Sequence, residues 1–298
     1  MTEFLQQLLN ALSLGAIYAL IALGYTMVYG VLRFINFAHS DVFMVGAVTG
    51  CLLGKHLPAG TWWGGLTCLL AAMVVCAALG MLIERFAYRP LRSSPRLNVL
   101  ITAIGVSLLL EYTFQNEHVF GAAPRAFPQV FPQVVWQLRG LTLSSNQLLV
   151  IAVALVLMVA LQFIVFRTKI GTAMRAVALN PRAAQLVGIN PDVVVSFTFA
   201  LGSALAGAGG ILYALNYQSV EPLMGVMPGL KAFVAAVIGG IGNIPGAALG
   251  GLLIGTIETF VGGSQLSTYK DAIAFALLIL ILLFRPTGLL GRRYVEKV

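Results

Sequence analysis

Apolar stretches long enough to cross a lipid bilayer fill most of this 298-residue chain and restrict it to the membrane. About 20 apolar residues in a helix cross the hydrocarbon core of a bilayer. Hydrophobic residues make up 59% of the chain and charged residues only 9%, whereas a soluble domain averages about 25% charged residues. The sequence therefore predicts an all-α polytopic membrane protein, with a single transmembrane domain over residues 1–298.

The apolar stretches divide the chain into eight or nine segments, depending on how a broken pair near the C-terminus is counted. The expected segments are Phe4–Tyr29, Phe37–Leu53, Trp62–Ile83, Leu97–Phe114, Leu148–Phe166, Val193–Leu215, Leu230–Gly239, Gly246–Val261 and Ala272–Phe284. Leu230–Gly239 is too short to span alone, so the broken pair forms either a complete hairpin or a re-entrant loop. Irregular backbone at membrane depth must be surrounded by protein or by a water-filled cavity. Gly239, Gly240, Gly242 and Asn243 are therefore predicted to lie inside the protein, beside a pathway.

Positive charge indicates how the segments are oriented, because loops rich in Lys and Arg stay in the cytoplasm. Three such loops are present, at Arg85–Arg96, Arg167–Arg182 and Arg285–Lys297. The longer stretch 115–145 has few cations and is predicted to be an external loop. No Lys or Arg precedes Arg33, so the N-terminus is predicted to be external as well. If the short segment Phe37–Leu53 were re-entrant instead of spanning, Met1 would be cytoplasmic.

The segment 167–191 is basic, contains no acidic residue, and predicts two short helices between long ones. The apolar stripes of these helices are Met174, Val177 and Ala178 in the first, and Ala183, Leu186 and Val187 in the second. Asn180–Pro181 predicts an N-cap followed by proline at the first helical position. Gly188 is placed to end the second helix.

A basic helix pair held between membrane spans suits docking onto another protein. The alternative is an amphipathic linker that lies on anionic lipid headgroups. The predicted docking residues are Gly171, Met174, Arg175, Val177, Ala178, Asn180, Pro181, Arg182, Ala184, Leu186 and Gly188.

Polar and small residues inside the apolar segments indicate function and packing. Asn36, His39 and Asp41 crowd the start of the second segment, and Glu258 lies in the eighth. Polar and ionisable residues at membrane depth are functional candidates, so these four are predicted to line a pathway. Small residues recur four apart at Gly202, Ala206 and Gly210, at Gly246 and Gly250, and at Gly251 and Gly255. This spacing predicts close helix packing, either within the chain or between subunits.

The sequence contains no motif for catalysis, for nucleotide binding or for a metal. It has no G-x-x-x-x-G-K-[ST] loop and no H-E-x-x-H helix. Cys51, Cys68 and Cys76 all lie in apolar segments, which indicates small core residues. The net charge of +8 comes from short loops, so it indicates membrane orientation rather than nucleic-acid binding. We therefore predict no catalytic residue, no metal site and no cofactor on this chain.

Several stretches in order along the chain resemble the LivH-type permease subunit of bacterial branched-chain amino acid ABC importers. These stretches are Asn36–Ala47, Glu84–Arg92, Arg175–Ala184, Lys231–Gly246, Tyr269–Asp271 and Arg285–Gly291. The family usually has Gly at the position of Ser40, and often Glu or another polar residue at that of Arg182.

The resemblance implies an ABC importer permease in the bacterial inner membrane that forms half of a translocation pathway for branched-chain amino acids. It implies as partners a second, related permease, two ATPase subunits that bind the ATP, and a periplasmic substrate-binding protein. The basic segment 167–191 would then contain the coupling helix that docks on an ATPase. Two alternatives stay open, namely a permease of the same family for amides or urea, and a secondary carrier driven by an ion gradient.

Overall fold

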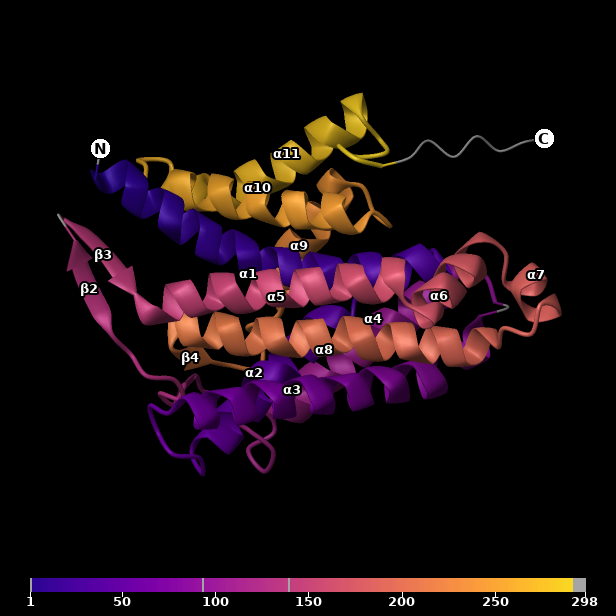
Figure 1. The fold of residues 1–298 in the computed structure, drawn as a ribbon, viewed down its shortest axis with the longest axis horizontal. Helices are drawn as coiled ribbons and strands as arrows, with labels where there is room; N and C mark the ends of the chain where they lie inside the picture. Colours follow the sequence, from indigo (N-terminus) through magenta and orange to yellow (C-terminus); the bar gives the residue numbers. More distant parts are fainter. Residues whose placement is uncertain (1, 93, 139, 292–298) are drawn as a thin grey trace.

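The computed structural model describes residues 2–92, 94–138 and 140–291, and long helices dominate it (Figure 1). The helical elements are α1 (Thr2–Leu32), α2 (His39–Gly54), α3 (Trp62–Ile83), η1 (Glu84–Tyr88), η2 (Arg89–Leu91), α4 (Arg96–Gln115), α5 (Ser145–Arg167), α6 (Lys169–Leu179), α7 (Pro181–Leu186), α8 (Pro191–Tyr217), α9 (Val226–Gly239), α10 (Ile244–Gly262), η3 (Ser267–Tyr269) and α11 (Lys270–Phe284). The strands are β1 (Arg125–Ala126), β2 (Val135–Leu138), β3 (Leu141–Ser144) and β4 (Ser219–Val220). Met1, Arg139, Arg292, Arg293 and Lys297, which bear on the predicted orientation, lie outside the described residues.

Seven helical segments of the described chain are long and apolar enough to cross a membrane, and α2 and α9 are shorter apolar helices. All nine predicted segments are therefore helical, and the all-α polytopic fold is confirmed. The boundaries differ in detail. The first helix continues to Leu32, and α9 begins at Val226, four residues before the predicted start.

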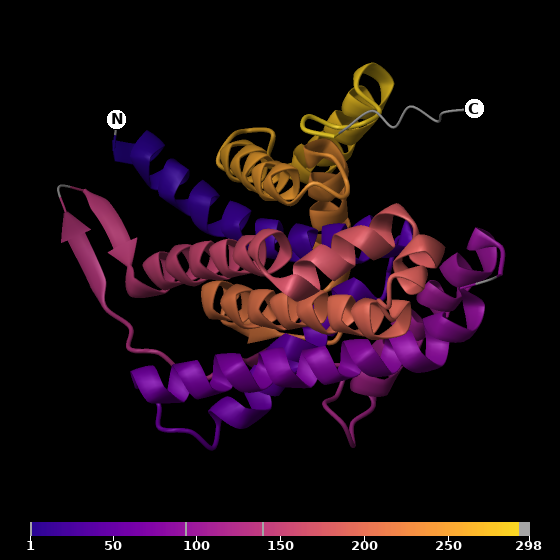
Figure 2. The ribbon, with the colours of Figure 1, turned by 45° about the vertical axis from the view of Figure 1, so that its right-hand side comes forward.

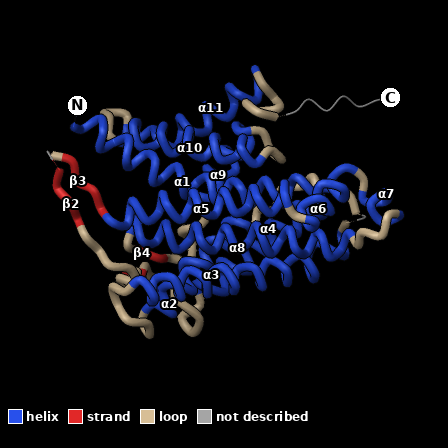
Figure 3. The backbone as a smooth tube through the Cα atoms, viewed as in Figure 1, coloured by secondary structure: helices blue, strands red, loops and turns tan. Residues whose placement is uncertain are grey.

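The bundle has two distinct ends (Figure 1). The β2–β3 hairpin, which comes from the predicted external loop, lies at the same end as the start of α1. The short helices α6 and α7 lie at the opposite end. We refer to these as the hairpin end and the α7 end. Figure 3 shows that the drawn strands gather toward the hairpin end, where β1 also pairs with β4. The predicted topology likewise places the N-terminus and residues 115–145 on one side.

The core surrounds α1, whose residues 13–28 are all buried. Figure 2 shows α3, α8 and α5 in successive layers, with α10 and α11 on the side opposite α3. Glycines make the closest approaches: Gly251 and Gly255 of α10 lie against the backbone of α1, and Gly202 of α8 lies against Gly24. These small residues pack within the chain, so the intrachain alternative is confirmed for them. Cys51, Cys68 and Cys76 are buried core residues, as predicted.

The two short helices α2 and α9 start beside each other, well inside the bundle. The His39 ring at the start of α2 lies against Gly24 of α1, about two turns before α1 ends. At the start of α9, Gly225 packs on the Ser40 carbonyl and Gly229 on the Ser40 side chain, so these glycines leave room for that residue. From this level α2 runs to the hairpin end, and α9 runs to the α7 end.

The broken pair α9–α10 turns back at the α7 end, and α9 itself starts inside the bundle and is shorter than a membrane span. Gly242, in its turn, lies beside Gly30 near the end of α1, and Gly263, after α10, lies beside Gln7. Helix α10 therefore runs antiparallel to α1 along most of its length. Gly240 and Gly242 have φ values of 104° and 92°, which favour glycine.

The predicted position of this break, at membrane depth in the interior, is wrong for part of the turn. Gly239 and Gly240 are buried, but Gly242 is exposed at the α7 end. The segment after α11 covers the turn. Leu289 and Leu290 donate backbone hydrogen bonds to Ile238 and Gly239 at 2.8 and 3.1 Å, and Asn243 Nδ2 donates to the Leu290 carbonyl at 2.7 Å.

Candidate functional site

Side-chain caps form the two short helices at the α7 end. The Thr168 hydroxyl accepts a hydrogen bond from the Gly171 amide at 3.2 Å and starts α6. Asn180 Oδ1 accepts from the amides of Arg182 and Ala183 at 3.0 and 3.1 Å and starts α7, with Pro181 at its first position. Gly188, at φ 85°, follows the helix. The predicted caps at Asn180 and Gly188 are confirmed; the Thr168 cap was not predicted.

The docking residues predicted from the sequence do not share one exposed face. Met174, Val177 and Ala184 are 2–3% exposed and pack against the same chain. The apolar side chains that point outward are Leu179, Leu186 and Val187, which are 72%, 89% and 75% exposed. We refer to these three residues, together with the exposed Arg182 beside them, as the α7 tip.

Two of the predicted docking residues hold α6 against α5 instead. Arg175 donates to the backbone carbonyl of Val165 and lies 5.6 Å from the Phe166 ring. Gly171 packs so closely on the carbonyls of Ile164 and Val165 that any side chain would collide with them. Helical periodicity does not predict these contacts, because it marks an apolar stripe without showing whether the stripe packs on the other helices of the same chain.

An ion-pair network at the same end joins the chain after α7 to the end of α3. Asp192, in the first turn of α8, accepts from Arg89 and from Arg92, the latter at 2.6 Å. Arg92 also pairs with the fully buried Glu84, and Ser196 donates to Glu84 at 2.5 Å. This network was not predicted from the sequence, although Glu84 directly follows an apolar segment and Asp192 directly follows the Asn190–Pro191 cap.

Replacing Asp192 by Asn is expected to lower stability modestly, because it removes two partly exposed ion pairs. Such pairs contribute about 0–1 kcal/mol each. The purified protein should unfold a few degrees earlier, and the difference should shrink in high salt, which screens exposed charges. Glu117→Asn at an exposed position near the hairpin end serves as the control. A midpoint unchanged at low salt would show that the pairs add no stability.

The three polar residues around the start of α2 point to different partners. The Tyr88 hydroxyl donates to Asn36 Oδ1 at 2.5 Å, and Ser107 of α4 donates to Asp41 Oδ2 at 2.5 Å. The His39 ring lies 4.7 Å from the ring of Tyr25. All three are buried within the chain. The structure does not bring them together with Glu258 or with the 239–243 turn.

Glu258 forms the centre of a buried charge network between four helices. Lys231 Nζ, on α9, lies 2.6 Å from Glu258 Oε1 and 2.6 Å from Asp271 Oδ1, on α11. The Tyr18 hydroxyl, on α1, donates to Glu258 Oε2 at 2.7 Å. Glu258 is the predicted intramembrane carboxylate, but its partners were not predicted, although Lys231 is itself a cation inside an apolar segment.

A polar cavity of about 340 Å³ lies next to this network, toward the hairpin end. Five helices supply its lining, namely α1, α5, α8, α10 and α11, each from the part that lies toward the hairpin end. The lining residues are Asn10, Ser13, Leu14, Gln147, Asn216, Tyr217, Glu258, Thr259, Gly262 and Lys270. We refer to it as the outer polar pocket. Among the predicted pathway residues, Glu258 lines it.

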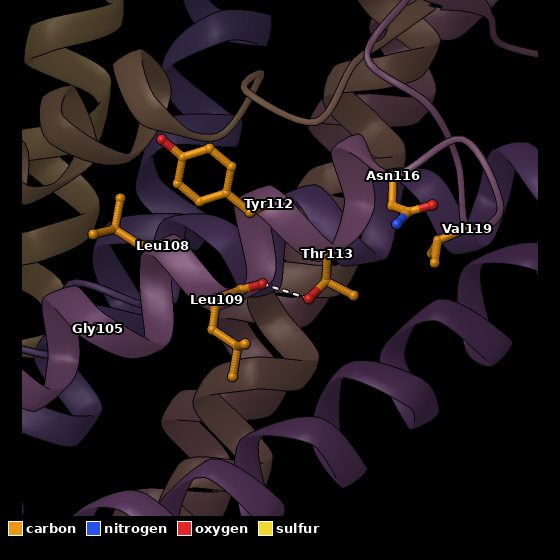
Figure 4. A pocket seen from close by; sticks show the side chains of 7 residues that line it. All are labelled: Gly105, Leu108, Leu109, Tyr112, Thr113, Asn116 and Val119. Atoms are coloured by element: carbon orange, nitrogen blue, oxygen red, sulfur yellow. Dashed lines mark hydrogen bonds between the residues drawn. The ribbon is translucent and has the colours of Figure 1, made fainter.

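A second hollow, of about 570 Å³, is an open groove on α4 (Figure 4). Its wall is mainly apolar, with Leu108, Leu109 and Tyr112 all exposed. The hydroxyl of Thr113 is engaged by the Leu109 carbonyl, to which it donates at 2.6 Å. The groove therefore offers a surface on a helix that this chain hardly covers, and its lining among the described residues contains no charged group.

Comparison with known proteins gives matches over nearly the whole chain. Residues 7–282 match the protein family described as branched-chain amino acid transport system / permease component. The chain is 43% identical to the high-affinity branched-chain amino acid transport system permease protein BraD of Pseudomonas aeruginosa, covering 99% of this chain and 98% of the relative. It is also 43% identical to the permease protein LivH of Escherichia coli, with the same coverage. A more distant match is LivM of Escherichia coli, 24% identical over 93% of this chain and 68% of the relative.

Proposed function

This chain belongs to the permease family of branched-chain amino acid transport systems, and we propose that it forms half of an ATP-driven import pathway for these amino acids. It is a multi-pass membrane protein, and its relatives are transport permease subunits rather than enzymes. The observation that carries the proposal is identity above 40% along nearly the full length of two relatives with this printed function. We place the chain in the bacterial inner membrane, with its α7 end in the cytoplasm.

The partners follow from what this chain lacks and from what it resembles. Its sequence has no phosphate-binding loop, so ATP hydrolysis would take place on two partner ATPase subunits. The weaker likeness to LivM, another permease of a branched-chain amino acid system, supports a second, related permease as the other half of the pathway. A periplasmic binding protein would deliver the amino acid at the hairpin end.

The α7 tip is the surface that we assign to ATPase docking. Leu179, Leu186 and Val187 are large apolar side chains exposed at the end of the bundle, with Arg182 beside them. Movement of a docked ATPase would pass from α7 to α8 through the short link at Asn190. It would pass from α8 to the segment that follows α3 through the ion pair of Asp192 with Arg92. Helix α8 packs on α1, α2 and α3, so its displacement would reach the core.

Replacing Leu186 by Glu is expected to release the ATPases while leaving the permease folded, because this side chain touches little of its own chain. Loss of a central apolar anchor typically costs at least about 2 kcal/mol, or roughly thirtyfold in affinity. Co-purification of ATPase subunits should fall, and leucine uptake with it. Leu266→Glu, a matched change at an exposed leucine beyond α10, should leave both unchanged.

Full ATPase recovery with Leu186→Glu would contradict the docking assignment. Ala184→Glu is not a substitute for this experiment, because Ala184 is buried and a carboxylate there would disturb folding. Uptake that follows an ion gradient at constant ATP would indicate a secondary carrier. Competition by amides or urea but not by leucine would indicate the other substrate class.

A further inference from the structure

The outer polar pocket contains hydrogen-bonding groups that the described part of the chain leaves unused. Ser13 is one of the residues that line the pocket, and it is 1% exposed; its buried hydroxyl has no hydrogen-bond partner among the described residues. The Thr259 hydroxyl donates to the Gly255 carbonyl at 2.8 Å, which leaves its lone pairs available. Buried polar groups are nearly always satisfied, so an unpartnered hydroxyl on a cavity wall indicates a polar occupant.

The pocket also places opposite charges on one wall. The ammonium of Lys270 lies 3.9 Å from Glu258 Oε1, whereas that of Lys231 is at 2.6 Å, and the Lys270 side chain is 45% exposed. Lys270 is therefore only loosely paired with Glu258. A carboxylate that entered the pocket would meet this cation, and an ammonium group would meet Glu258 and the two hydroxyl oxygens.

Other lining groups favour a small ligand over water alone. Gln147 Nε2 donates to Asn10 Oδ1 at 2.7 Å, which ties α5 to α1 at the pocket wall. Leu14 and Tyr217 supply apolar surface beside the polar groups. A volume of about 340 Å³ falls in the range of about 300–1,000 Å³ that is usual for small-molecule sites.

We propose that the outer polar pocket binds the zwitterionic end of an α-amino acid, with the carboxylate at Lys270 and the ammonium at Glu258, Ser13 and Thr259. This inference rests on the proposed function and adds a substrate contact to it. The pocket lies at the hairpin end, so it would act early in import, before the amino acid passes deeper into the bundle. Recognition would depend on the two charges common to all α-amino acids.

The test is ligand protection of a cysteine placed in the pocket. Ser13→Cys is introduced into the complete transporter in membrane vesicles, and labelling by a small charged thiol reagent is timed. L-leucine at ten times its half-saturating concentration should slow labelling about elevenfold, as a competing occupant does. The amine 3-methylbutylamine and the acid 4-methylpentanoate each lack one of the two charges, so neither should protect at the same concentration.

Controls separate this inference from the proposed function. Ser264→Cys, exposed just beyond α10, should be labelled without protection, and the native protein with its three buried cysteines should stay unlabelled. Lys270→Gln combined with Ser13→Cys should keep the labelling and lose the protection. If the native complex imports leucine but Ser13→Cys is never labelled, or is protected equally by 4-methylpentanoate, the pocket assignment is overturned. If the native complex imports no leucine, the proposed function itself has failed.

Discussion

Replacing Lys231 by methionine will destabilise this permease by about 3–5 kcal/mol, the usual result of removing one partner from a buried ion pair. Lys231 and Glu258 are about 5% exposed, and Lys231 also pairs with Asp271. Methionine has a similar length, so the change removes the charge and leaves little empty volume. The buried Glu258 carboxylate would then lose its nearest cation in an apolar bundle, whereas Asp271 is partly exposed. The measurement is the thermal unfolding midpoint of the purified protein in detergent.

A second substitution tests whether the charge is the cause. Adding Glu258→Gln to Lys231→Met removes the stranded carboxylate and should recover part of the lost stability, as a double-mutant cycle would measure. Lys55→Met, at an exposed position after α2, is the matched control and should change the midpoint little. Equal midpoints for Lys231→Met and Lys55→Met would show that the network does not stabilise the fold.

Replacing Gly255 by leucine is expected to prevent the assembly of α10 on α1. A Cβ atom at Gly255 would collide with the backbone nitrogen and Cα of Gly15, which cannot move aside as a flexible side chain can. Extra methylene groups in a packed core cost about 1–3 kcal/mol, and a collision with backbone should exceed that. Little folded protein should be recovered, as judged by a monodisperse peak in size-exclusion chromatography.

The control for this prediction lies on the same helix. Gly262, at the end of α10, has no described atom outside its own helix and chain neighbours within 4 Å of where a Cβ would lie, so Gly262→Leu adds the same side chain into open space. Its yield and elution profile should match those of the native protein. Normal recovery of Gly255→Leu would contradict the close α1–α10 packing.

Local sequence signals predicted the local structure well. The cap at Asn180, the helix-ending Gly188 and the apolar segments each depend on a few neighbouring residues, and the structure contains all of them. Small residues four apart predicted close packing because small side chains let two helix backbones approach in an apolar medium. The sequence left open whether that packing was within the chain or between subunits. The partners of Gly202, Gly251 and Gly255 lie on α1, whereas Gly250 packs on α9 and Gly210 on α2.

The candidate sites were less predictable, because they depend on which faces meet. Periodicity marked both Met174 and Leu186 as apolar stripe residues, yet α6 turns Met174 onto its own bundle and α7 leaves Leu186 exposed. Glu258 was identified as an unusual intramembrane carboxylate. Its contacts with Lys231 and Tyr18, one of them 240 positions away in sequence, follow only from the packing of α9, α10 and α1.

The sequence by itself determined the class of this protein, its nine apolar helices, its capped loop helices and its family. These depend on composition, on short-range periodicity and on motifs in a fixed order, all of which are properties of neighbouring residues. The tertiary structure decided that α2 and α9 begin side by side within the bundle, and that the outer polar pocket forms beside Glu258. In an apolar chain almost every helix face looks suitable for burial, so hydrophobicity cannot select the contacts. Shape and buried charge select them, and both appear only when the helices are packed together.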